Sequence, residues 1–161
     1  MTTLRILPAL LLLLFLSPVQ GEERHYDEAN GFSVQLPAGW KSKQTGDDPI
    51  EKACWVSPNE DAEASVMMME AEVYGLADMV EAYKEGLGAQ KVLYESKIEL
   101  SGVPAHLLVT EEIEGIATIH TMIVHGGWFY DFGVFTEVST YQSDPEKYQA
   151  MGRTFRLEEG P

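Results

Sequence analysis

Two β-rich runs joined by a pair of glycines decide the fold, since residues 116–136 read IATIHTMIVHGGWFYDFGVFT. β-Branched and aromatic residues fill both runs, which is typical of strands. Gly126 and Gly127 stand between them, and glycine tolerates the positive φ that a two-residue hairpin turn requires. The stretch therefore predicts two antiparallel strands, residues 116–125 and 128–136, joined by a tight turn.

The strand pattern continues upstream of this hairpin, with one interruption. Residues 76–87 place apolar side chains every three or four positions, which predicts an amphipathic helix. Downstream, Ser143 and Glu146 have the spacing of a capping box, so a second helix is expected to begin there. The upstream strands are expected at residues 32–36, 53–57, 65–74, 92–100 and 105–113.

This order of elements determines the expected fold class. Consecutive strands joined by short turns imply a largely antiparallel sheet. We therefore expect an α+β fold in which a central, largely antiparallel β-sheet is flanked by helices. A single domain is expected over residues 31–161, whereas the polar residues 22–30 are expected to form a flexible N-terminal segment.

The first 21 residues have the organisation of a secretory signal peptide. Arg5 supplies a positive charge, residues 6–16 are almost purely apolar, and Val19 and Gly21 supply small or modest side chains before the cut. The apolar run is too short to span a membrane, which needs about 20 such residues. We therefore predict cleavage between Gly21 and Glu22 and a secreted or periplasmic location, with no membrane span after cleavage.

The charge balance limits the classes of partner. The chain has 11 basic and 26 acidic residues, so losing Arg5 with the signal leaves 10 against 26, a net charge of −16. Such a surface repels nucleic acid and anionic lipid headgroups. A cationic partner or a divalent metal would suit it, although the charge also simply keeps an exported protein dissolved. Cys54 is the single cysteine and is expected to be a small buried hydrophobe.

Three short motifs resemble those of PsbP-like domains. The opening motif GFSVQLPAGW occupies residues 31–40, and LSGVPA occupies residues 100–105 before a strand. The closing motif is the helical run from Tyr148 into Arg153-Thr154-Phe155. Together these motifs cover residues 31–157. The chain is thus similar to a family that includes the extrinsic photosystem II subunit, a nuclear Ran-binding protein and exported bacterial proteins.

The resemblance implies a central antiparallel sheet between helices, in agreement with the element order. It also implies a binding or assembly-assisting module without chemistry of its own, because the family shares a fold and not an activity. The matching residues are structural, and none is a catalytic residue: they are Pro37, Gly39, Trp40, Gly102 and Phe155.

Trp128 and Tyr130 are the first candidates for a binding surface. With Phe132 they share one face of the hairpin. A dense aromatic stripe is usually core, but any exposed part of it would form a ligand or partner patch. Met67 and Met69, which share a face of another strand, are the second candidates, because an outward methionine makes an adaptable surface.

His106 and His120 are the weak candidates for metal binding, and they would need to meet across neighbouring strands. His120 and His125 are five residues apart in one strand, so they lie on opposite faces. Met67 and Met69 could join a histidine in a copper(I) site. A histidine on an apolar strand face is more often a hydrogen-bonded core residue, so no metal and no cofactor is expected.

No motif of a hydrolase elbow, zinc protease or phosphate loop occurs in the sequence. The leading hypothesis is therefore an exported, non-enzymatic binding or assembly-assisting module for an unknown protein or envelope partner. A periplasmic carrier of a small ligand or metal ion is the first alternative, and a small hydrolase is the second. A pocket with converging polar groups would favour either alternative over the first hypothesis.

Overall fold

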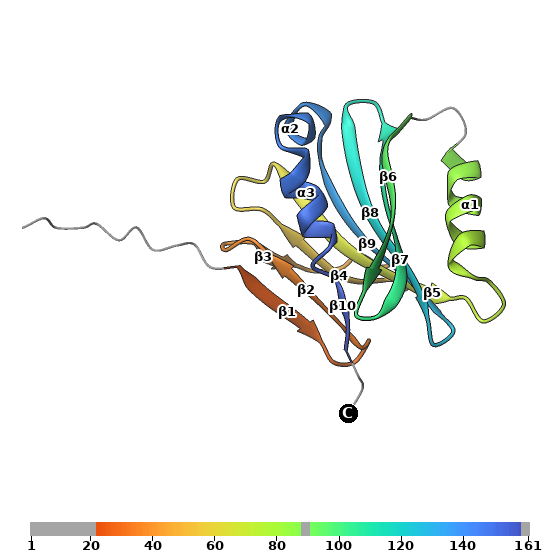
Figure 1. The fold of residues 1–161 in the computed structure, drawn as a ribbon. Coiled ribbons are helices and arrows are strands. Elements are labelled where there is room, and N and C mark those ends of the chain that lie inside the picture. Colours follow the sequence, from red (N-terminus) through yellow and green to blue (C-terminus); the bar gives the residue numbers. More distant parts are fainter. Residues whose placement is uncertain (1–21, 88–90, 159–161) are drawn as a thin grey trace, which may run out of the picture.

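The computed structural model describes residues 22–87 and 91–158, and it has the expected α+β architecture, dominated by antiparallel strands (Figure 1). The helices are α1 (Leu76–Leu87), α2 (Val138–Ser143) and α3 (Pro145–Gly152). The strands are β1 (Glu23–Asp27), β2 (Phe32–Leu36), β3 (Lys41–Lys43), β4 (Glu51–Val56), β5 (Ala62–Glu70), β6 (Lys91–Leu100), β7 (Val103–Ile113), β8 (Ile116–His125), β9 (Trp128–Glu137) and β10 (Arg156–Leu157).

Seven strands form one antiparallel sheet in the order β3-β4-β5-β9-β8-β7-β6. The predicted hairpin is confirmed, because His125 pairs with Trp128 across a turn in which Gly126 and Gly127 have φ of 58° and 82°. A side chain at either glycine would be strained at these angles. This turn sets the register of β8 against β9.

The large sheet has a different cover on each face (Figure 1). Helix α1 packs on one face against Leu108, Met122 and Phe129. On the other face lie α2, α3 and a three-stranded sheet in the order β1-β2-β10. There Phe155 stacks on Phe132 of the large sheet, with ring centroids 6.2 Å apart. This second face contains the main core, whereas α1 covers a smaller apolar cluster with polar groups beside it.

The expectation of a flexible segment over residues 22–30 is wrong, because β1 occupies Glu23–Asp27 and pairs with β2 along its whole length. The sequence of β1 has no clear alternation of apolar and polar residues that would predict a strand, because polar contacts help to hold this edge strand in place. The Arg24 guanidinium donates hydrogen bonds to Ser33 Oγ at 2.8 Å and to Gln35 Oε1 at 2.8 Å. The short strand β3 and helix α2 were also not expected from the pattern.

Several expected boundaries shift, and those of β5 and of the final helix are two examples. The strand expected at residues 65–74 is β5, which starts earlier and ends at Glu70. The final helix is capped by Asp144 rather than by Ser143, since an Asp144 carboxylate oxygen accepts a hydrogen bond from the Lys147 amide at 3.2 Å. Ser143 instead ends α2. The two short helices meet at Asp144, and this junction displaces the cap by one residue.

Cys54 is 8% exposed, which confirms its expected burial. Its burial raises the pKa of the thiol. Among the described residues, no helix is long and apolar enough to cross a membrane.

Candidate functional site

His120 of β8 and Asp131 of β9 meet under α1, beside the apolar cluster of Leu108, Met122 and Phe129. The hairpin register places His120 opposite Gly133 and Asp131 opposite Met122, so the two polar side chains are diagonal neighbours on one face. His120 Nδ1 lies 2.9 Å from Asp131 Oδ2. Both residues are 2% exposed. Two ionisable groups are thus fully removed from water and depend on each other.

Two further residues complete this network. Glu112 Oε1 and the Tyr83 hydroxyl oxygen each lie 2.7 Å from His120 Nε2. The Tyr83 hydroxyl also donates a hydrogen bond to Glu112 Oε1, and Thr110 Oγ1 donates to the same oxygen at 3.1 Å. Tyr83 comes from α1, and Glu112 follows Thr110 at a register shift of β7. The network therefore joins α1 to β7, β8 and β9.

The charges of the network stabilise one another. Burial alone would lower the pKa of His120, but the Asp131 carboxylate and then Glu112 raise that pKa to about 9. The hydrogen bond from His120 lowers the pKa of Glu112 to about 2, against the effect of burial. Burial, and after it the Glu112 carboxylate, raises the pKa of the Tyr83 hydroxyl. At neutral pH the imidazolium therefore donates from both nitrogens, and Tyr83 stays protonated.

The hydrogen bonds of this network determine whether its residues could act in catalysis. A general base or an activated nucleophile needs a free lone pair directed at a substrate. Here both nitrogens of His120 are occupied, and the tyrosine hydroxyl is held in its protonated form. The network therefore has the properties of a charged clamp that fixes α1 on the sheet.

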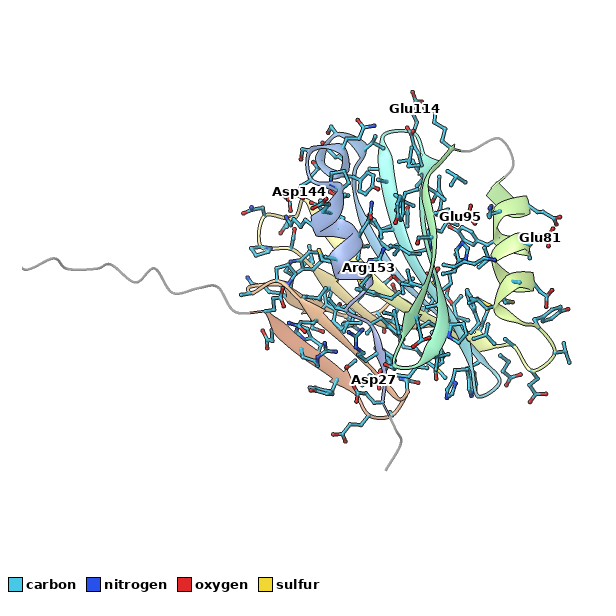
Figure 2. All side chains as sticks on the ribbon, in the orientation of Figure 1. Asp27, Glu81, Glu95, Glu114, Asp144 and Arg153 are labelled. Atoms are coloured by element: carbon cyan, nitrogen blue, oxygen red, sulfur yellow. The ribbon has the colours of Figure 1, made fainter. Side chains whose placement is uncertain are left out.

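An open groove of about 470 Å³ lies beside the clamp, between α1 and β6. Figure 2 shows the Glu95 side chain in the space between these elements. The Lys84 ammonium donates to Glu95 Oε2 at 2.8 Å, and His106 Nε2 lies 2.9 Å from Glu95 Oε1. Lys84 and then His106 lower the pKa of Glu95. The groove is lined by Ala77, Val80, Glu81, Lys84, Glu85, Glu95, Lys97 and His106.

The structure separates the four residues proposed as a binding surface. Tyr130 is 6% exposed and belongs to the main core, whereas Trp128, at the end of the same strand, is 37% exposed. Met67 and Met69 pair with Asp131 and Phe129, so they lie on the α1 side, opposite to the two aromatic residues. The four side chains therefore form no common patch, and Trp128 is the one exposed side chain among these four.

The two candidate metal ligands also stay apart. His106 lies opposite Met122, and His120 lies opposite Leu108, so the two histidines share a face without being direct partners. Each has its own carboxylates. Across residues 22–87 and 91–158 no three His, Cys, Asp or Glu residues form a group that could hold a metal ion.

No protein-family model matches the sequence, and no curated protein matches it either. The solution structure of cyanobacterial PsbP (CyanoP) from Synechocystis sp. PCC 6803 matches with a TM-score of 0.66 and 12% identity, over 88% of this chain and 95% of that chain. The fold is PsbP-like. A crystal structure from Bacteroides thetaiotaomicron VPI-5482 matches with a TM-score of 0.53 and 10% identity, over 87% of this chain and 49% of that chain.

The motif residues of the PsbP-like resemblance have structural positions. Gly39 has a φ of 86°, and a Cβ there would lie 3.0 Å from Pro58 Cγ, so the turn requires glycine. Trp40 is 9% exposed, and Phe155 is fully buried between Phe32 and Phe132. These residues build the PsbP-like core and lie outside the clamp and the groove.

Sequence reasoning missed Asp131, Glu112 and Tyr83 as members of a site. One signal was present for Asp131, because it is a lone carboxylate in an aromatic strand, and the hairpin register places it beside His120. A buried carboxylate needs a partner, and the nearest ionisable group on that face is this histidine. Glu112 and Tyr83 had no comparable signal, because their contacts depend on a strand irregularity and on helix packing.

Proposed function

We propose that this protein is an exported, non-catalytic binding module that holds a segment of a protein partner in the groove between α1 and β6. The single observation that carries the proposal is the groove itself, an open concavity whose α1 wall is fixed on the sheet by the buried clamp. Preorganised walls reduce the entropy lost on binding. The PsbP-like fold supports a binding or assembly-assisting function, and export rests on the signal-like residues 1–21.

The lining of the groove indicates the chemistry of the partner segment. Ala77 and Val80 provide an apolar wall on α1. Glu81, Glu85 and Lys97 form no salt bridge with another described residue, so these charges remain available to a ligand. The chain as a whole is acidic, with 26 acidic and 11 basic residues. A segment with basic side chains next to small apolar ones fits best.

The clamp argues for binding rather than catalysis at this place. Its ionisable groups are paired with one another, and they lie beneath α1 instead of in the groove. Glu95 and His106, which do line the groove, are also paired with each other. We therefore infer that the titratable residues hold the groove in shape, and that the partner is recognised by side-chain complementarity along its walls.

The experiment is a selection of peptides from a random displayed library on the folded protein, followed by NMR mapping of the synthetic peptides. Selected peptides are expected to be basic and to shift the amide signals of Ala77, Lys97 and His106. Ala77→Trp fills the groove and should abolish binding. Ala82→Trp is the matched control, because Ala82 is exposed on the same helix but does not line the groove. Binding that survives Ala77→Trp, or peptides that shift only residues elsewhere, would overturn the proposal.

A second candidate function, the carriage of a small ligand, is favoured by a different cavity. A cleft of about 680 Å³ separates β1 and β2 from β3 and β4, and His25 and Trp55 line it. Among the described residues, His25 Nε2 is the one buried side-chain nitrogen or oxygen without a hydrogen-bond partner. Native mass spectrometry of protein purified gently from its own host tests this function, because a carrier would show added mass that His25→Phe removes.

A further inference from the structure

The two edge strands of the large sheet differ in how readily each could pair with a strand of another chain. One end is β3, which has only three residues, including the exposed Lys41 and Lys43. Short, charged edge strands resist pairing with another chain. The other end is β6, which has ten residues and, in the described part of the chain, a strand neighbour on one side only. The long free edge of the sheet is therefore β6 (Figure 1).

The side chains around Ser96 of β6 form a regular pattern. Glu95 and Lys97 are exposed on the face that α1 covers, where both line the groove. Tyr94 and Ile98 point to the opposite face, where they pack half-buried against the main core. The strand thus presents opposite charges on one face and apolar groups on the other, symmetrically about Ser96.

We propose that β6 pairs in antiparallel fashion with β6 of a second copy of this chain, with Ser96 at the two-fold axis. This register places Glu95 of each copy opposite Lys97 of the other. On the other face it places Tyr94 of each copy opposite Ile98 of the other. Opposite charges and apolar groups directly across adjacent strands stabilise a sheet. The two-fold axis makes each of these two contacts occur twice.

Neighbouring registers lack this complementarity. A shift of the axis by one residue places Glu95 opposite its own copy, or Lys97 opposite its own copy. Like charges directly across a strand pair are destabilising. Glu95 keeps its contacts to Lys84 and His106 in the dimer, because a carboxylate has about four acceptor sites. The charge pattern therefore favours this register over the two adjacent ones.

In the dimer the two grooves would be joined. This consequence rests on the proposed function, whereas the dimer itself does not rest on it. Helix α1 packs over β7 and β8 of its own sheet. Strands lie about 4.8 Å apart, so the two α1 axes would be about 19 Å apart on one face of the joined sheet. Helices are about 10 Å wide, which leaves a channel about 9 Å wide over the paired β6 strands. Such a channel would enclose a partner segment from both sides.

The native mass in solution tests the dimer. The wild-type chain is expected to sediment at twice the chain mass, with dissociation on dilution and at high salt. Lys97→Glu places like charges in contact at two symmetric positions and should yield the single-chain mass. Lys41→Glu makes the same charge change on the opposite edge and should leave the dimer intact. A wild-type protein that stays at the single-chain mass, or a dimer that Lys97→Glu does not weaken, would overturn the proposal.

Cross-linking tests the register. Directly opposite residues in antiparallel strands have Cα atoms about 4.5–5.5 Å apart, which is within the range of a disulfide. Ser96→Cys is therefore expected to give a covalent dimer on oxidation. Glu99→Cys lies on the same strand but faces residue 93 of the other copy, so it should stay unlinked. Equal linking of both variants would show that this register is wrong.

The tests can refute the dimer and the binding function of the groove independently of each other. Ala77→Trp fills the groove from the α1 side and leaves every residue of β6 as it is, so the dimer mass is expected to stay unchanged. A dimer that persists while no peptide binds would leave the β6 pairing standing and refute the proposed function alone.

Discussion

Asp131 Oδ2 lies 2.9 Å from His120 Nδ1, and this contact connects β9 to β8 on the face that α1 covers. The pair is buried, and the other ring nitrogen of His120 contacts a second carboxylate, that of Glu112. A buried ion pair contributes little relative to a well-packed apolar core, but removal of one partner leaves a charge without compensation. The clamp is therefore sensitive to single substitutions.

Replacement of Asp131 by Asn should destabilise the fold strongly. The change keeps the shape of the side chain but leaves the His120 imidazolium with half of its compensating charge. We expect the free energy of unfolding to fall by about 3 kcal/mol or more, as for other broken buried pairs. Urea unfolding measures the loss. Asp47→Asn, in an exposed loop, is the control, and a loss for Asp131→Asn no larger than for this control would contradict the clamp.

Stability should fall as the pH rises above neutrality. The pKa of His120 in the folded protein is about 9, above the unfolded value of 6.5, because the buried carboxylates favour the imidazolium. A raised pKa contributes stability that is fully present below pH 6.5 and is lost as the pH rises through about 9. At 1.36 kcal/mol per pKa unit the loss amounts to roughly 3 kcal/mol. Urea midpoints measured at several pH values in this range check it.

His120→Gln provides the comparison for the pH experiment, because glutamine does not titrate. Its stability should change little between pH 6.5 and 9. If the urea midpoint depends on pH equally in the wild type and in this variant, another titrating group causes the change in stability. At acid pH the sign is opposite, since the lowered pKa of Glu112, about 2, gives a contribution that is present above 4.5 and is lost as the pH falls towards 2.

The fold was largely accessible from the sequence, because local period and turn chemistry act over short distances. The change from alternation to a helical period at residues 76–87 predicted α1, and Gly126 and Gly127 predicted the hairpin that sets the β8–β9 register. The strand β1 had no such signal. Its residues alternate poorly, and its polar contacts to β2 become visible only in three dimensions.

The site was less accessible, because its members come from separate elements. Tyr83 and His120 are 37 residues apart, and their contact depends on how α1 settles on the sheet. Glu112 faces His120 at the irregularity where β7 leaves its regular register. The pairing of His120 with Asp131 was the one part that hairpin register alone could have placed.

A matched pair of glycines tests the packing of the two sheet faces. Gly152 lies where α3 touches the sheet, and a Cβ there would be 2.7 Å from Thr121 Oγ1 and 2.9 Å from Leu107 Cδ1. Gly152→Ala should therefore cost about 1–3 kcal/mol through overpacking. Gly86 in α1 has no heavy atom within 4 Å of that position, so Gly86→Ala should stabilise the protein by about 0.5–1 kcal/mol. Thermal unfolding compares them, and the same sign for both would refute this packing.

The aromatic strand β9 should divide into a core part and an exposed end. Phe132 is fully buried, so Phe132→Ala is expected to cost about 3–5 kcal/mol of unfolding free energy. Trp128 is 37% exposed at the end of the strand, and Trp128→Ala should cost less than half as much, because part of its surface already contacts water.

Urea unfolding of both variants, with near-ultraviolet circular dichroism to confirm native packing, gives the two costs. A folded Trp128→Ala protein with a small loss would leave this residue as an exposed apolar group at the sheet end, beside its strand partners Glu70 and His125. A loss equal to that of Phe132→Ala would instead make Trp128 part of the main core. In that case the whole aromatic stripe would be structural, and Trp128 would be excluded as part of a partner surface.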